Sequence, residues 1–100
     1  MATGQIKLPQ NTDIKMNVIE NSGAYSDSAL LTVLRNSSLI QSRQIEAFLV
    51  PFTGGFRTGL CFLYEDTKLY GWILVFHYDQ TPRYLGVSNG VTTVRQFATT

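Results

Sequence analysis

The fold is decided by residues 44–98, QIEAFLVPFTGGFRTGLCFLYEDTKLYGWILVFHYDQTPRYLGVSNGVTTVRQFA. Turn-forming residues recur here about every ten residues, which is the spacing of an antiparallel meander. They predict strands at 44–52, 56–64, 69–78, 83–88 and 91–98, separated by turns at 53–55, 65–68, 79–82 and 89–90. The paired glycines at 54 and 55 permit the positive φ angles that a hairpin loop needs.

Two of these strands carry apolar side chains at every second position. In the strand at 56–64, one face receives Phe56, Thr58, Leu60, Phe62 and Tyr64. In the strand at 69–78, one face receives Tyr70, Trp72, Leu74, Phe76 and Tyr78, and the other receives Leu69, Gly71, Ile73, Val75 and His77. A strand that is apolar on both faces has to be covered on both. One helix cannot cover such a sheet, so we expect self-association to cover the rest.

The dipeptide Asn89-Gly90 is the strongest hairpin signal in the chain. A two-residue type I′ turn requires positive φ at both positions, and Asn and Gly tolerate this best. A loop of this length also determines which residues face each other. The predicted pairs are Ser88 with Val91, Val87 with Thr92, Leu85 with Val94, and Tyr84 with Arg95.

The N-terminal part has weaker patterns. Residues 1–24 are polar, and only the alternation from Ile14 to Val18 predicts a strand, short and near an edge. Residues 26–35 predict a helix that begins at Ser26 or Asp27 and places its leucines on one side. Residues 37–43 are a connector. We therefore expect a single domain over 1–100, mainly β: a small antiparallel β-sandwich or meander of five to six strands with one short helix near residues 26–35.

Composition argues against catalysis and against charged partners. The chain has one His and one Cys, and no metal-ligand spacing, so we expect no enzyme, cofactor or metal site. His77 has no orienting partner nearby in sequence, and Cys61 in an apolar run is typical of a buried hydrophobe. Eight basic against seven acidic residues give a net charge of +1, which does not steer the chain onto nucleic acid. Neither a secretory signal nor an apolar run of membrane-spanning length is present in the sequence.

Aromatic residues make up 12% of the chain, and most lie between Phe48 and Phe97. Trp72, in mid-strand, is more typical of a core or a subunit interface than of a sugar-binding platform. The turn at 79–82 and its flanks combine two rings, a cation, a carboxylate and an amide, and turns are free to carry specificity. The candidate ligand-binding residues are Tyr78, Asp79, Gln80, Arg83, Tyr84 and Arg95.

Residues 71–76, GWILVF, together with 82–91, PRYLGVSNGV, and 96–99, QFAT, resemble the terminal β-domains of phage tail fibres and related virion proteins. The opening MATGQIK likewise resembles the polar start of small virion proteins that assemble without processing. The resemblance implies a structural protein that is made in the host cytoplasm without a signal peptide and resides in the virion. It implies a homotrimer, whereas base rates for soluble oligomers favour a dimer. The implied partners are other virion proteins and a host-surface glycan or protein.

Other functions remain open at this point. A small inhibitor or adaptor that binds another protein through an exposed sheet edge or apolar face fits the low charge and small size. A sugar-binding module unrelated to phage, or a small enzyme, are the remaining alternatives. The oligomeric state distinguishes the first two, because an appendage domain is expected to be trimeric and an inhibitor monomeric.

Overall fold

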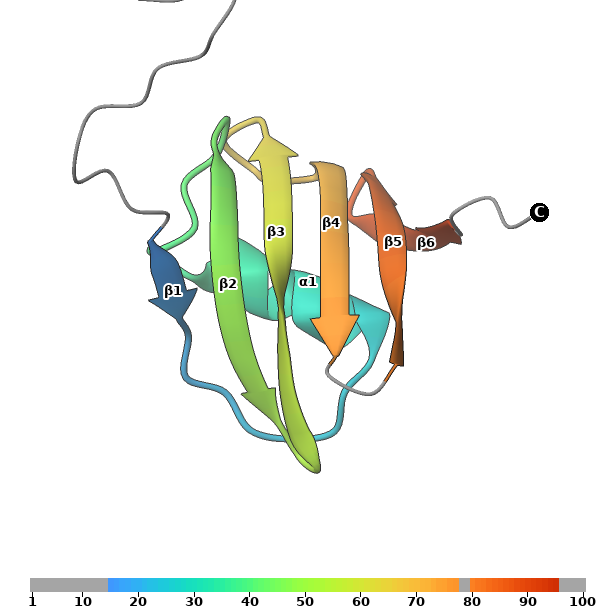
Figure 1. Ribbon diagram of the computed structural model, residues 1–100. Coiled ribbons are helices and arrows are strands. Elements are labelled where there is room, and N and C mark those ends of the chain that lie inside the picture. Colours follow the sequence, from blue (N-terminus) through green and yellow to red (C-terminus); the bar gives the residue numbers. More distant parts are fainter. Residues whose placement is uncertain (1–14, 78–79, 96–100) are drawn as a thin grey trace, which may run out of the picture.

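The computed structural model describes residues 15–77 and 80–95, which form one sheet with a helix on one side (Figure 1). The strands follow chain order across the sheet, from β1 to β6. Their bounds are β1 Met16–Val18, β2 Ile45–Phe52, β3 Gly55–Tyr64, β4 Tyr70–His77, β5 Gln80–Ser88 and β6 Val91–Arg95, and the helix α1 spans Asp27–Asn36. The expected mainly β fold with one short helix is confirmed, and of its two forms the meander is the one observed.

Strand pairing is antiparallel from β2 to β6, and only β1 pairs in parallel with β2. The parallel pair follows from the path of the chain, because α1 and its loops lie between β1 and β2 and return the chain to the starting end of the sheet. The sheet is therefore mixed, which the sequence did not predict.

Helix α1 forms because its ends and its apolar side are both well specified. Ser26 caps the helix by accepting a hydrogen bond at its Oγ from the backbone N of Ala29, at 3.0 Å. The three buried helix residues Leu30, Leu31 and Leu34 are at most 3% exposed, and they pack on the sheet. Their partners in the core come from β2 to β5: Phe48, Val50, Phe52, Cys61, Leu63, Ile73, Val75, Leu85 and Val87.

The hairpin at Asn89-Gly90 is confirmed in both conformation and register. Asn89 has φ 52° and Gly90 has φ 78°, as the predicted turn requires. The pairs run from Ser88 with Val91 to Tyr84 with Arg95, as expected. The first of the predicted meander turns, at 53–55, is also a tight connection, in which Phe52 pairs directly with Gly55.

The predicted turn at 79–82 is wrong over most of its length. Strand β5 begins at Gln80, which pairs with His77, so Thr81 and Pro82 belong to the strand. The register shifts between Val75 and His77, which leaves more residues on β5 than on β4 across the irregularity. Proline is tolerated in a strand at such a bulge, because the ladder there does not need its missing N–H.

Candidate binding surface

The side of the sheet that faces away from α1 is the most distinctive surface of the protein, and we call it the open face. Alternation and register assign its positions. They are Met16 and Val18 in β1, Ile45, Ala47, Leu49 and Pro51 in β2, Phe56, Thr58, Leu60, Phe62 and Tyr64 in β3, Tyr70, Trp72, Leu74 and Phe76 in β4, Tyr84, Gly86 and Ser88 in β5, and Val91, Thr93 and Arg95 in β6. In the described part of the chain no element lies over this face, whereas α1 crosses behind the sheet (Figure 1).

Exposure of large apolar side chains is concentrated on the open face. Nine large hydrophobic residues are exposed among those described, and seven of them occupy open-face positions: Met16, Val18, Ile45, Phe56, Tyr64, Phe76 and Val91. Only Leu39, in the loop after α1, and Val94, on the opposite side of β6, lie elsewhere. Large exposed apolar patches on soluble proteins are typical of interaction sites.

Aromatic rings form a continuous row across β3 and β4 at one end of the open face. The rings of Phe62 and Trp72 are stacked, with centroids 6.2 Å apart and planes at 23°. Tyr64 continues the row, with its ring centroid 6.1 Å from that of Phe62 and 5.8 Å from that of Tyr70. All three centroid distances lie within the range in which aromatic pairs attract one another. The row is therefore preorganised, and a partner would meet rings that are already ordered.

Charge is distributed unequally between the two sides of the sheet. The positions of β1 to β5 on the open face hold no charged residue, and Arg95 in β6 is the single charge among the face positions defined above. Glu46, Arg57 and Arg83 all fall on the side of α1. The open face is thus both apolar and electrically neutral over most of its breadth.

Four of the six predicted ligand-binding residues have a place in the described strands. Tyr84 and Arg95 are cross-strand partners on the open face, so the structure brings these two together. Arg83 points to the side of α1, and Gln80 pairs through the backbone with His77. Tyr78 and Asp79 lie outside the described residues. Neighbouring residues in a strand project to opposite faces, so Arg83 and Tyr84 do not share a surface.

Arg83 instead belongs to a polar cluster at the start of α1. Its Nη2 donates to Oδ2 of Asp27 at 2.6 Å, and the hydroxyl of Tyr25 donates to Oδ1 of the same carboxylate at 2.7 Å. The guanidinium of Arg57 lies over the Tyr25 ring, 4.3 Å from its centroid. The hydrogen bond to Asp27 raises the pKa of Arg83, and burial followed by the bond to Asp27 raises the pKa of Tyr25. The cluster fastens the helix to β3 and β5.

Of the two candidate reactive side chains, Cys61 lies in the core and His77 lies at the end of a strand. Cys61 is fully buried in the core, and burial, with a smaller effect of Glu46, raises the pKa of its thiol to about 12. At neutral pH it is therefore a thiol and not a nucleophilic thiolate. His77 lies at the end of β4 beside Gly55, where its Nε2 is 3.2 Å from the place that a Cβ would take. Within residues 15–77 and 80–95, no three His, Cys, Asp or Glu side chains gather as metal ligands would.

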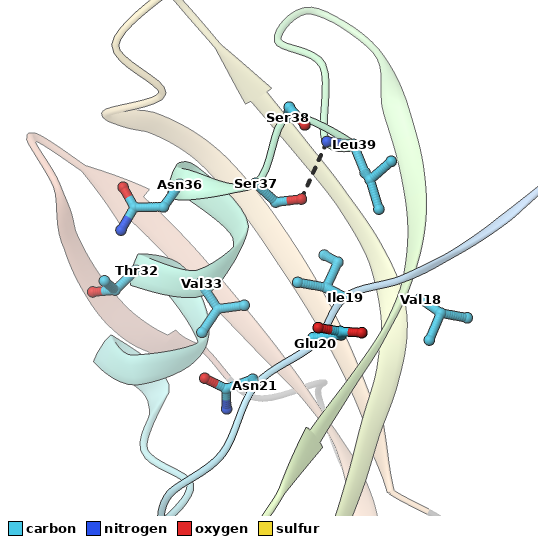
Figure 2. Close-up of a pocket in the computed structure, with 10 residues that line it drawn as sticks. All are labelled: Val18, Ile19, Glu20, Asn21, Thr32, Val33, Asn36, Ser37, Ser38 and Leu39. Carbon is cyan, nitrogen blue, oxygen red and sulfur yellow. Dashed lines mark hydrogen bonds between the residues drawn. The ribbon is translucent and has the colours of Figure 1, made fainter.

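A shallow groove of about 730 Å³ lies between α1 and the chain that follows β1 (Figure 2). Its apolar wall comes from Val18, Ile19, Val33 and Leu39, and its polar rim comes from Glu20, Asn21, Thr32, Asn36, Ser37 and Ser38. Some of these polar groups are already engaged in the structure. Asn21 donates to the carbonyl of Pro51 at 2.9 Å, and Ser37 Oγ accepts from the backbone N of Leu39 at 3.1 Å. The groove holds a single carboxylate and no acid–base pair.

Sequence reasoning placed rings on one face of each of two strands but did not select them as a site. The register joins them, because Phe62 pairs with Trp72 and Tyr64 pairs with Tyr70. Alternation was the signal that could have found this surface. Val18, the exposed apolar residue of β1, had no such signal, because its side depends on the parallel pairing of β1 with β2.

Comparisons with known proteins give no relationship: no family model, no curated protein and no solved structure matches this chain.

The length of the described helix bears on membrane insertion. The one described helix has ten residues, and nothing in the described ranges forms a helix with the length and apolarity needed to cross a bilayer.

Proposed function

We propose that this chain is a non-catalytic structural protein of a phage virion, a tail-fibre or appendage domain that works by associating with other protein chains through the open face. The observation that carries the proposal is the neutral, aromatic surface of β2 to β4, over which no described element lies. The resemblance of residues 71–76 and 82–91 to tail-fibre domains supports the virion as the setting.

Energetics favour an assembly role for this face. Fully burying one exposed large apolar side chain is worth ~1.5–3 kcal/mol. The seven residues are 39–63% exposed, so each would gain roughly half of that energy when a partner covers it. Rings that are already stacked lose little conformational freedom when a partner covers them. The same face has no charged group or acid–base pair over β1 to β5, which suits packing better than chemistry.

Contact with a host-surface glycan or protein is the finer part of the proposal. Its support is the cross-strand pair of Tyr84 and Arg95, which places a ring and a cation side by side near one edge of the open face. A ring against the sugar C–H face and a guanidinium to orient hydroxyls is a combination that carbohydrate recognition uses. The residues Tyr78, Asp79, Gln80 and Arg83 stay predictions for this contact.

The test of the virion role is incorporation into particles. Cells that produce the phage would supply the wild-type chain or a variant, and purified particles would be analysed by mass spectrometry. We expect the wild-type chain in fixed proportion to the major virion proteins. Phe76→Glu, which puts a charge on the open face, should abolish incorporation. Val94→Glu is the matched control, because Val94 is 43% exposed, close to the 39% of Phe76, but lies on the other side.

Two outcomes would contradict the virion role. One is a chain that is abundant in producing cells and absent from particles. The other is normal incorporation of a folded Phe76→Glu variant, which would show that the open face is not the contact. Circular dichroism of each purified variant separates a lost contact from a lost fold.

A small inhibitor or adaptor is the second candidate, and one observation favours it. Strand β6 ends the sheet, pairs on one side with β5, and exposes Val91 and Val94 at 62% and 43%. An edge of this kind can accept an added strand from a partner. Hydrogen-bonded and non-hydrogen-bonded pairs alternate in the ladder of this two-residue hairpin, so the N–H of Thr92 points away from β5. Replacing Thr92 by proline would therefore block strand addition at this edge, and a loss of activity in that variant, with Phe76→Glu fully active, would favour the inhibitor.

A further inference from the structure

We infer that the occupant of the open face is a second copy of this chain, and that two sheets pack face to face as the two layers of a β-sandwich. This inference rests on the proposed function, because it names the partner that meets the same surface. Sheets that pack in this way lie ~10 Å apart with their strands within about 30° of each other. The dimer would turn a one-sided sheet into a closed core.

Charge is the first argument for a second copy. A partner that used acidic or basic side chains would find no complement on the open-face positions of β1 to β5. It would lose the hydration of its own charges without compensation, which is costly. Another open face brings the same neutral set of rings and aliphatic chains. It is the one partner surface of matching chemistry that is certain to be present wherever this chain is made.

Area is the second argument. Strands β2 and β4 have eight residues each, and five strands from β1 to β5 share the face. At ~3.3 Å per residue and ~4.8 Å between strands, the face measures about 26 by 24 Å, or roughly 600 Å². Two copies would bury about 1,200 Å², which reaches the lower end of the ~1,200–2,000 Å² of stable specific interfaces.

The shape of the surface favours two copies over three. One broad sheet face is covered completely by one other sheet face, and a two-fold interface of this kind closes on itself. Three sheets around an axis would each cover only part of a neighbour and would leave exposed residues at the face margins, such as Val18 and Ile45, without a partner. We therefore expect a dimer in place of the trimer that the tail-fibre resemblance implies.

Trp72 provides a built-in probe of this interface. It is the only tryptophan in the chain, and it lies half-buried in the ring row at one end of the open face. Light scattering of the purified chain should give twice the monomer mass of 11.2 kDa. On dilution, the mass should halve, and the Trp72 emission should shift to longer wavelength over the same concentration range, because dissociation exposes the ring to water.

Variants then locate the contact. Ile45→Glu and Phe76→Glu place charges on two separated parts of the open face and should weaken the dimer at least 100-fold, giving monomers with unchanged circular dichroism. Phe76→Leu keeps the face apolar and should remain dimeric. Val94→Glu, on the side of α1, is the matched control and should also remain dimeric. If a Glu variant does not fold, the dilution experiment on the unmodified chain still shows whether the chain dimerises and whether dissociation exposes Trp72.

Three results would overturn the second-copy inference. The first is a monomer up to millimolar concentration. The second is a trimer, or a dimer in which Val94→Glu and not Phe76→Glu causes dissociation. The third is a monomer whose Trp72 emission shifts to shorter wavelength only with neutral phosphatidylcholine vesicles, which would make lipid the occupant. A monomer that still enters particles, and fails to do so as Phe76→Glu, would overturn the dimer but leave the virion role standing.

Discussion

Replacing Asp27 by alanine should destabilise the protein far more than its place at a helix end would indicate. One carboxylate joins three elements, because it accepts hydrogen bonds from Tyr25 and from Arg83, at 2.7 and 2.6 Å, and occupies the first turn of α1. The side chain of Asp27 is 19% exposed, so its partners do not regain full hydration when it is removed. Nε of Arg83 is already buried and has no hydrogen-bond partner among the described residues.

The magnitude follows from these contacts. A hydrogen bond to a charged group is worth ~1.5–3 kcal/mol, and an acid in the first helical turn adds ~0.3–1 kcal/mol. The Arg83 side chain is 40% exposed, so solvent screens the ion pair and places it at the low end. We expect Asp27→Ala to lower the free energy of unfolding by about 2–3 kcal/mol, which corresponds to a melting temperature lower by at least ~8 °C in a domain of this size.

Urea denaturation, followed by circular dichroism at one fixed protein concentration, measures this loss and keeps any effect of self-association constant. Asp66→Ala is the control. Its carboxylate also faces an arginine, but the Arg43–Asp66 distance is 3.7 Å and the two side chains are 68% and 87% exposed, so we expect a change within ~0.5 kcal/mol. An Asp27→Ala protein as stable as Asp66→Ala would refute the argument that the cluster fastens α1 to the sheet.

Four further outcomes test the fold and the absence of chemistry. Gly90→Val, at φ 78°, should lower the free energy of unfolding by more than ~1 kcal/mol, and unchanged urea denaturation would argue against the tight turn. Gly71→Ala should cost more than Gly90→Val, because its Cβ would come within 1.9 Å of the Phe62 carbonyl oxygen. Because the pKa of the buried Cys61 thiol is about 12, the folded chain keeps a proton that the unfolded chain loses above pH ~8.5. The free energy of unfolding should therefore fall as the pH rises from ~8.5 towards 12, and it should fall less steeply in Cys61→Ala. A native thiol that reacts with Ellman's reagent at pH ~8 would contradict the burial of Cys61. His77→Ala should stay functional wherever it folds, and outright loss of function in a folded variant would assign His77 a chemical role.

The site was less predictable than the fold. Alternation alone placed Phe62 and Tyr64 on one face of their strand and Trp72 and Tyr70 on one face of the next. It could not show that these faces coincide, because the loop at 65–68 permits more than one register. By contrast, Arg83 and Tyr84 are close in sequence and were grouped as one site, although adjacent strand residues project to opposite sides.

Local patterns in the sequence were sufficient for the order of elements, the capped helix at its leucine-rich segment, and the Asn89-Gly90 hairpin with its pairing. Each of these depends on residues a few positions apart, so period and turn chemistry determine them. Tertiary structure decided the rest. The parallel pairing of β1 with β2, the entry of Pro82 into β5 at a bulge, and the choice of which sheet face α1 covers all depend on contacts between distant segments. A chain with apolar residues on both faces of its central strands does not encode locally which face receives its only described helix. That choice follows from the Asp27–Arg83 cluster and the packing of Leu30, Leu31 and Leu34, and it leaves the ring row on the side that no described element covers.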